Sequence, residues 1–230
     1  MRALVYDFHG NLPALEAVLD DARAAGADGF LLGGDYGLFG PWPAETVAKL
    51  RQLPDATWIR GNVDRWTARP NEAPDDELIQ AAIDACRQAL GEQLVSELEA
   101  LPEQLVIEGT RYCHGSPISD VRSFTPSTAD EDDELLGGVA EPRVVFGHTH
   151  LQFSRRTAAG IELVNPGSAG MPFDGDPRAA YALLADDGRL ELRRVAYDHE
   201  ASAATVEERY PGAPWAERSA RRLRQAQMCD

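Results

Sequence analysis

Three short apolar runs in the first sixty residues each end at a polar turn that contains glycine. The runs cover residues 3–6, 29–32 and 57–59, and runs this short with such boundaries are typical of buried strands. Apolar residues at helical spacing fill the stretches between them, at residues 12–22 and 43–53. This alternation predicts parallel strands and an α/β class, in which ligands gather at the carboxyl ends of strands.

The pattern changes in the middle of the chain. Residues 66–101 form an insertion in which a loop rich in proline and acidic residues precedes two predicted helices, at about 76–90 and 92–101. After Pro102 the apolar period shifts toward two, which is typical of strands, and tight glycine turns indicate antiparallel hairpins. The expected strands are 104–108, 110–114, 144–146, 151–157, 161–165, 180–184 and 190–197.

These later strands predict a second sheet packed on the first. Neither an internal repeat nor a low-complexity linker divides the sequence. We therefore expect a single domain over residues 1–230, with a C-terminal helical tail over about 199–230.

Composition narrows the classes of function. The 230 residues include 43% hydrophobic residues, which excludes global disorder. Lysine and arginine number 22 and aspartate and glutamate 38, so the net charge is 22 − 38 = −16. This sign disfavours non-specific nucleic-acid binding and attachment to anionic membranes.

Cysteine usage and hydropathy indicate the cellular setting. The three cysteines, Cys86, Cys113 and Cys229, lack the spacing of a disulfide framework or a thiolate zinc site. No run approaches the 18 apolar residues of a membrane span, and the first apolar run is too short for a signal peptide. We expect a reduced, soluble, cytoplasmic protein without membrane partners, and homo-oligomerisation stays open.

Histidines mark the candidate chemistry, because four of the five follow apolar runs in short polar motifs. Two pairs, Asp7 with His9 and His148 with His150, have a spacing of two, which on extended chain places both side chains on one side. The fifth histidine, His199, lacks such a context. The candidate metal ligands are Asp7, His9, Asp35, Asn62, His114, His148 and His150.

Seven ligands exceed the needs of one tetrahedral ion and suit two ions that share a bridging carboxylate. Imidazole, carboxylate and amide oxygen without thiolate suit Mn²⁺, Fe, Zn²⁺ or Ni²⁺, with Mn²⁺ the first expectation. The sequence therefore predicts two divalent metal ions as cofactors.

Six ordered motifs, which span the chain from residue 7 to residue 168, carry a family resemblance. They are D-x-H-G-N at 7–11, G-D at 34–35, G-N at 61–62, H-G-S at 114–116, G-H-T-H at 147–150 and N-P-G-S at 165–168. In this order they resemble the calcineurin-like metallophosphoesterase superfamily, in its small bacterial phosphodiesterase-type branch. The resemblance implies an αββα sandwich of two mixed β-sheets flanked by helices.

The resemblance also implies a dinuclear site and a hydrolytic reaction. The first ion would be held by Asp7, His9, Asp35 and His150, and the second by Asp35, Asn62, His114 and His148. Asp35 would bridge the ions and position a metal-bound hydroxide that attacks phosphorus. The implied function is a metal-dependent phosphoesterase that acts on a small phosphate ester.

One departure from the family pattern affects the chemistry. Members usually carry a histidine after Gly-Asn, as the acid that protonates the leaving oxygen, whereas this chain has Val63. Tyr36 and Arg65 are the nearby candidates for a substitute donor or a phosphate contact, although a packing or surface role is the alternative for each. Phosphodiesters are favoured over monoesters because a strong acid is not evident.

Two other classes of function stay open. A metal-bound, catalytically weak or silent scaffold for protein partners is favoured by Val63 alone. A nuclease is disfavoured by the net charge of −16 and by the absence of a basic run near the motifs. The sequence leaves the physiological substrate and the native metal open.

Overall fold

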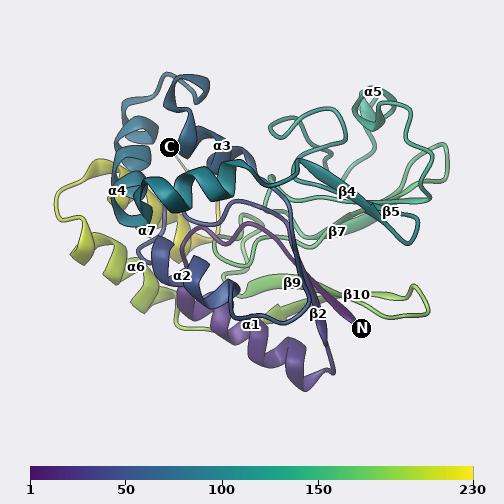
Figure 1. Ribbon diagram of the computed structural model, residues 1–230, viewed down its shortest axis with the longest axis horizontal. Coiled ribbons are helices and arrows are strands. Elements are labelled where there is room, and N and C mark those ends of the chain that lie inside the picture. Colours follow the sequence, from purple (N-terminus) through teal and green to yellow (C-terminus); the bar gives the residue numbers. More distant parts are fainter. Residues whose placement is uncertain (230) are drawn as a thin grey trace.

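The computed structural model describes residues 1–229 and contains two five-stranded sheets packed face to face (Figure 1). The first sheet has the order β10-β9-β1-β2-β3, with β1, β2 and β3 parallel and β9 antiparallel to both of its neighbours. Its strands are β1 (Arg2–Val5), β2 (Gly29–Leu32), β3 (Ala56–Trp58), β9 (Ala179–Leu184) and β10 (Leu190–Val195).

The second sheet has the order β4-β5-β6-β8-β7. Its central strands β5, β6 and β8 are parallel, and antiparallel strands form both edges. Its strands are β4 (Gln104–Ile107), β5 (Thr110–Cys113), β6 (Arg143–Val145), β7 (Phe153–Arg156) and β8 (Glu162–Asn165). Each sheet therefore has three parallel strands whose carboxyl ends can carry ligands.

Helices cover the outer faces of the sheets, mostly that of the first (Figure 1). They are α1 (Leu12–Ala24), α2 (Pro43–Leu50), α3 (Asn62–Ala68), the 3₁₀ turn η1 (Pro70–Glu72), α4 (Glu77–Glu99), α5 (Asp132–Leu136), α6 (His199–Arg209) and α7 (Pro214–Gln225). Among residues 1–229, none of these helices is long and apolar enough to cross a membrane.

The alternation of side chains along β1 divides the hydrophobic core into layers. Ala3 and Val5 pack with the helices on the outer face, whereas Leu4 packs between the two sheets against Val145 and Val164. A third cluster lies on the far side of the second sheet near α5. Because strand side chains alternate between faces, both sheets bury both of their faces. The predicted αββα sandwich is confirmed.

Each predicted strand and helix is present, with ends shifted by a few residues. The prediction of two helices over 76–101 is confirmed in detail, because Gly91 has φ 76° and ψ 157° and interrupts α4. Asn11 caps α1, since its side-chain oxygen accepts from the Ala14 nitrogen at 3.4 Å.

Two features differ from the expectation. The last strands, β9 and β10, were expected in the second sheet but join the first sheet through β1. An apolar period of two predicts a strand, but it does not indicate which sheet the strand joins. Helix α3 was not predicted, because it begins directly after Gly61 without the side-chain cap that usually marks a helix start.

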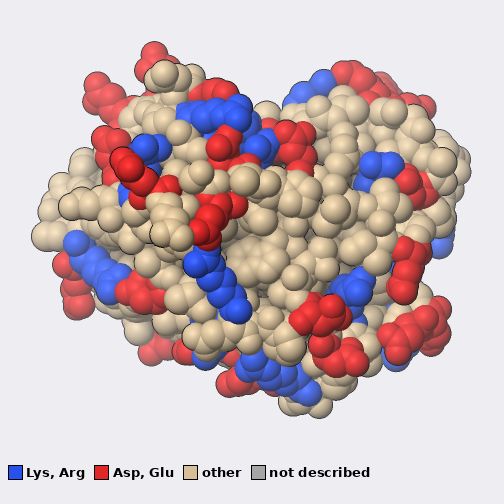
Figure 2. Space-filling model, viewed as in Figure 1, with Lys and Arg blue, Asp and Glu red and all other residues tan. Residues whose placement is uncertain are grey.

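Charged side chains of both signs are mixed on one face of the molecule (Figure 2). On the face shown in Figure 2, lysine and arginine side chains are scattered among acidic ones and do not gather in a single patch.

Candidate metal centre

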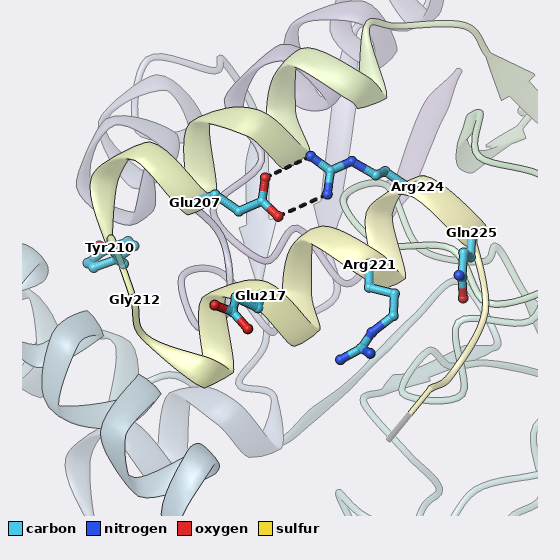
Figure 3. A pocket seen from close by; sticks show the side chains of 7 residues that line it. All are labelled: Glu207, Tyr210, Gly212, Glu217, Arg221, Arg224 and Gln225. Carbon is cyan, nitrogen blue, oxygen red and sulfur yellow. Dashed lines mark hydrogen bonds and ion pairs between the residues drawn. The ribbon is translucent and has the colours of Figure 1, made fainter.

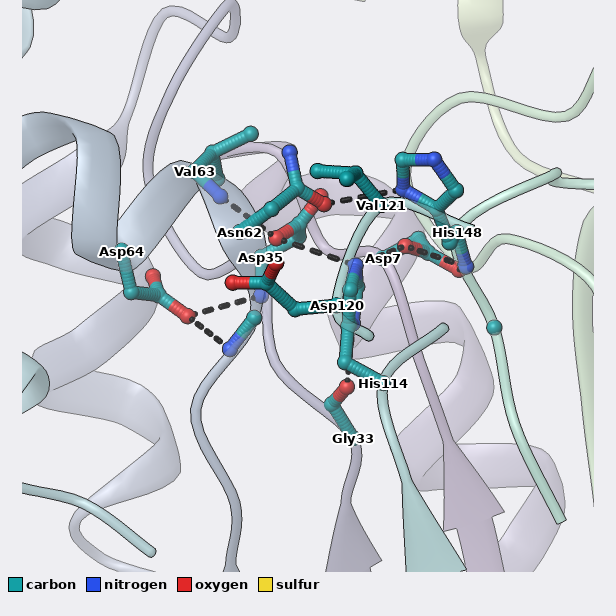
Figure 4. Close-up of polar contacts among 12 residues, drawn as sticks. Asp7, Gly33, Asp35, Asn62, Val63, Asp64, His114, Asp120, Val121 and His148 are labelled. Atoms are coloured by element: carbon teal, nitrogen blue, oxygen red, sulfur yellow. Dashed lines mark hydrogen bonds and ion pairs between the residues drawn. The ribbon is translucent and has the colours of Figure 1, made fainter. Parts of the chain in front are cut away.

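The loops after five parallel strands meet at one end of the sandwich and bring the seven predicted ligands together. Asp7 and His9 follow β1, Asp35 follows β2, and Asn62 begins α3 after β3. From the second sheet, His114 follows β5, and the G-H-T-H histidines follow β6. Six of the seven side chains are buried, and that of His148 is partly exposed. Figure 4 shows several of them converging.

Four of these residues form a compact group. The ligand atoms of Asp7, His9, Asp35 and His150 all lie within 4.8 Å of one another. The Nε2 atoms of the two histidines are 3.0 Å apart. His150 Nε2 lies 3.5 Å from Asp7 Oδ1, and His9 Nε2 lies 3.7 Å from Asp35 Oδ2. This group could hold one metal ion.

Of the remaining candidates, His114 lies beside the other oxygen of Asp35, and His148 and Asn62 contact each other. His114 Nε2 is 3.3 Å from Asp35 Oδ1, and His148 Nδ1 is 2.9 Å from Asn62 Oδ1 (Figure 4). The two oxygens of Asp35 therefore face different histidines, Oδ2 toward His9 and Oδ1 toward His114.

Hydrogen bonds to main-chain carbonyls fix the tautomers of three histidines. The Nδ1 distances are 2.9 Å from His9 to Leu38 O, 2.8 Å from His114 to Gly33 O and 2.6 Å from His150 to Met171 O. A carbonyl oxygen only accepts, so Nδ1 carries the hydrogen in each ring. When these rings are neutral, each Nε2 therefore presents a lone pair to the cluster, as metal-ligating histidines do.

This arrangement fits a cation. The lone pairs of His9 and His150 face each other at 3.0 Å, and two acceptors this close repel unless a positive charge lies beside them. His114 Nε2 is buried and has no hydrogen-bond partner within the described part of the chain. Imidazole nitrogens and carboxylate oxygens are ligands that divalent Mn, Fe, Ni and Zn accept.

Electrostatics point to the same need for positive charge. Burial raises the pKa of Asp7 well above its usual range, and it lowers the pKa of His9 and of His150. Burial also opposes protonation of His114, yet the carboxylates of Asp35 and Asp7 raise its pKa to about 10. A nearby cation strongly stabilises carboxylates that are buried this deeply, and a metal ion can supply that charge.

Backbone conformation, rather than extended chain, aims the ligands. The φ angles are 56° at Asp7, 46° at His9, 60° at Asp35, 68° at His148 and 57° at His150. The pairs Asp7–His9 and His148–His150 were expected to lie on extended backbone. This expectation is wrong, because β1 and β6 end before these residues and the residues have left-handed φ angles. Such φ values are costly for residues other than glycine and cluster at functional sites.

Asp64 organises this end of the first sheet, although it was not among the predicted site residues. Its carboxylate accepts hydrogen bonds from the backbone nitrogens of Gly61 (2.8 Å), Asp35 (2.9 Å) and Tyr36 (3.1 Å). Burial raises the pKa of Asp64 to about 7. An acidic residue two positions after the G-N motif was the available signal, since such a residue in a first helical turn can bind free nitrogens.

Close approach to ligands explains two motif glycines. A Cβ atom on Gly61 would lie 2.1 Å from Asp35 Oδ1, and one on Gly147 would lie 2.5 Å from Asp7 Oδ2. Neither distance is sterically possible without movement of a ligand. The glycines of G-N and G-H-T-H therefore keep space for the carboxylates.

The N-P-G-S motif supports the cluster without joining it. Ser168 Oγ donates to the carbonyl of Asp7 at 2.8 Å and accepts from the Met171 nitrogen at 2.7 Å. Asn165 Nδ2 donates to the carbonyl of Gly147 at 3.0 Å. These bonds tie the β8–β9 connection to both ligand loops.

Tyr36 does not face the ligands, which corrects that expectation. Its buried hydroxyl lies 2.9 Å from the carbonyl oxygen of Leu32 and 2.8 Å from that of Ile59. Its ring stacks on Phe8, with ring centres 5.4 Å apart. Burial also raises its pKa well above the usual range. Tyr36 is therefore a packing residue, which is the alternative role that the sequence left open for it.

Arg65 lies near the cluster but is occupied by carboxylates. Its Nε and Nη2 bind Asp120 at 2.7 and 2.8 Å, and its Nη1 binds Glu72 at 2.8 Å. It lines a neighbouring cavity of about 270 Å³ beside His114. The role proposed for it as a donor or phosphate contact therefore gains no support from this geometry.

A cavity of about 200 Å³ opens over the candidate ligands. His9, Asp35, Asn62, His148 and His150 form its floor, and Val63 lies in its wall. Other walls are mainly apolar and come from Phe39, Trp66, Ile79, Met171 and Phe173. Most of these wall residues belong to elements that are far apart in the chain and carry no motif, so they were not predicted.

Comparisons place the chain in a family. The calcineurin-like phosphoesterase superfamily domain matches residues 1–188, and the chain belongs to this superfamily. This membership makes it a phosphoester hydrolase by family, in a group that uses divalent metal ions, and it confirms the resemblance.

Individual relatives agree. A metallophosphoesterase from Sphaerobacter thermophilus has a TM-score of 0.81 at 28% identity and covers 98% of each chain. An uncharacterised protein of Methanocaldococcus jannaschii is 27% identical and covers 86% of this chain and 88% of its own. A hypothetical protein from Pyrococcus horikoshii OT3 shares the fold, with a TM-score of 0.87 at 19% identity and full coverage of both chains.

Proposed function

We propose that this protein is a phosphodiesterase that works with two divalent metal ions. The observation that carries the proposal is the placement of Asp35, whose Oδ2 lies 3.7 Å from His9 Nε2 while its Oδ1 lies 3.3 Å from His114 Nε2. One carboxylate between two groups of ligands is the arrangement that a bridging residue needs.

The first ion would be held by Asp7, His9, Asp35 and His150, and the second by Asp35, Asn62, His114 and His148. Two divalent ions lower the pKa of bound water and neutralise charge on phosphoryl oxygens. The residues of this chain hold the lone pairs in place through the carbonyl bonds to Nδ1. Mn²⁺ is the ion we propose first, with Fe, Zn²⁺ and Ni²⁺ as alternatives.

Val63 bears on the substrate class. Its side chain lines the cavity, and an aliphatic group cannot give a proton to a leaving oxygen. We propose that diesters with good leaving groups are the favoured substrates, since a positioned acid contributes about 10²–10⁴-fold to rate. The mixed surface charge and the net charge of −16 support a small phosphate ester rather than nucleic acid. Two buried thiols, Cys86 and Cys113, support a reduced, cytoplasmic setting.

Hydrolysis of bis(para-nitrophenyl) phosphate tests this proposal. We expect turnover with added Mn²⁺, loss of turnover on chelation and loss of turnover in Asp35→Ala. Val63 favours one other function, a metal-bound scaffold for protein partners. Protein that holds two ions but releases no nitrophenolate under any divalent metal would support the scaffold and contradict the phosphodiesterase.

The bridging role has its own measurement. Asp35→Ala removes an oxygen from each group of ligands, so we expect both ions to be lost together from folded protein. Metal analysis by mass spectrometry, beside wild type loaded in parallel, gives the count. One tightly held ion in the variant would contradict the bridge.

A further inference from the structure

The cavity over the candidate ligands has one wall that lies outside the family match. Arg218 and Arg222 of α7 line it, together with Met228 beyond the end of that helix. The superfamily domain ends at residue 188. Helix α7 packs on α6 and α4 (Figure 1) and so brings C-terminal side chains over a site built from β1 to β6.

Two side chains of this cavity contain buried donors without an acceptor. Arg218 Nε and Trp66 Nε1 are buried, and neither has a hydrogen-bond partner among residues 1–229. Arg218 forms an ion pair with Asp76, whose Oδ2 lies 3.6 Å from Nη1, and this pair leaves Nε without an acceptor among the described residues. An unsatisfied buried donor is costly, so two around one cavity indicate that an acceptor oxygen of a ligand belongs there.

Arg222 is a second guanidinium that lines the same cavity. The guanidinium carbon of Arg222 lies 5.9 Å from the centre of the Phe173 ring, and its Nε donates to the Cys229 carbonyl at 3.1 Å. The Phe173 ring stacks in turn on the candidate ligand His150, with centres 4.3 Å apart. Arg222 is therefore one aromatic ring away from the cluster.

The size and lining of the cavity limit what can enter. Its volume of about 200 Å³ is below the roughly 300–1,000 Å³ of sites for drug-sized ligands. Phe39, Trp66 and Phe173 supply aromatic walls. The cavity therefore has room for a compact ring.

We propose that α7 makes this site selective for phosphoesters whose organic group is a compact ring that carries a second anionic group. Arg218 is the specificity-determining contact, and Trp66 supplies a second donor in the same cavity. The planar guanidinium suits a carboxylate or phosphate, because its N–H groups match two oxygens at once. This inference rests on the proposed phosphodiesterase function and deepens it.

The test compares two substrates with the same leaving group. These are para-nitrophenyl phenyl phosphate and para-nitrophenyl carboxyphenyl phosphate, and the measured quantity is the ratio of their kcat/KM values with Mn²⁺. We expect wild type to prefer the carboxyphenyl ester by roughly tenfold or more, as a charge-assisted hydrogen bond allows. Arg218→Gln is expected to abolish this preference, and Trp66→Phe to reduce it.

Arg221→Gln is the matched control, because it removes the same charge from the same helix. Arg221 lines a different pocket, of about 450 Å³, between α6 and α7 (Figure 3). We expect its ratio to equal that of wild type. Arg218→Lys keeps the positive charge but lacks the planar guanidinium, and it replaces Arg218→Gln in the test if that variant does not fold. We expect it to reduce the ratio of the two kcat/KM values. An unchanged ratio in a folded Arg218 variant would overturn the proposal.

Binding separates this inference from the proposed function. Calorimetry with Mn²⁺-loaded protein compares phenylphosphonate with carboxyphenylphosphonate, neither of which can be hydrolysed. Tighter binding of the carboxylate form that depends on Arg218, in protein without turnover, would support the inference and contradict the hydrolase. Turnover of both esters with equal binding of both phosphonates would contradict the inference and leave the hydrolase standing.

Discussion

At position 63 a valine side chain lines the cavity, while its backbone nitrogen donates to Asp35 Oδ1 at 3.1 Å. The backbone thus helps to orient a candidate bridge, and the side chain contributes no proton. A nitrophenolate can leave unprotonated, whereas an alkoxide largely cannot. The rate should therefore depend steeply on the basicity of the leaving group.

Val63→His places an imidazole at the wall of that cavity. We expect turnover of alkyl esters to rise by roughly tenfold or more, since a positioned acid contributes about 10²–10⁴-fold. Activated aryl esters should change little. The measurement is kcat/KM over a series of leaving groups in both proteins. A wild-type rate that is insensitive to the leaving group would indicate a hidden donor.

Cysteine chemistry is not expected to contribute. Burial raises the pKa of both Cys86 and Cys113 to about 12, so neither thiol is a nucleophile at neutral pH. A variant with all three cysteines replaced by alanine or serine should keep specific activity within a few-fold and lose some stability at Cys113, which is 1% exposed. Complete loss of turnover in the folded triple variant would show that this interpretation is wrong.

At the scale of elements, the apolar pattern predicted nearly every strand and helix. Each of them buries one or both faces, so its apolar residues recur with the period of a strand or a helix. It could not assign β9 and β10 to the first sheet, since pairing depends on long-range contacts with β1. The motifs predicted which ligands to consider, but not that five of them have left-handed φ. Several walls of the cavity come from α3, α4 and α7, whose approach depends on packing.

The break in α4 offers a test of an element. Gly91 has φ 76° and ψ 157°, a conformation that is essentially restricted to glycine. A Cβ atom there would meet nothing within 4 Å, so backbone strain alone determines the effect of Gly91→Ala. We expect a loss of about 1–3 kcal/mol in the free energy of unfolding, measured by urea denaturation.

Metal content is the control for that variant. Because Gly91 does not line the cavity over the ligands, Gly91→Ala should keep its bound ions once folded. Gly61→Ala is the contrast, since its Cβ would lie 2.1 Å from Asp35 Oδ1, and we expect it to lose ions. Equal metal loss in both variants would contradict this separation.

At the scale of the whole molecule, the candidate ligands join the two sheets. Asp7, His9, Asp35 and Asn62 come from the first sheet, and His114, His148 and His150 come from the second. An ion bound by both sets connects the sheets at one end of the sandwich, and the hydrophobic layer between them fills the rest. Metal binding should therefore stabilise the entire fold rather than one loop.

Addition of Mn²⁺ to chelator-treated protein should raise the Tm by roughly 5–10 °C. A ligand at a hundred times its Kd contributes about 2.7 kcal/mol, and each kcal/mol corresponds to about 2–4 °C in a chain of this size. Differential scanning calorimetry measures the shift, and Asp35→Ala, which lacks the bridge, should show little of it. Hydrogen exchange should slow at the ends of β1 and β6 alike. Protection confined to one sheet would contradict a centre shared between them.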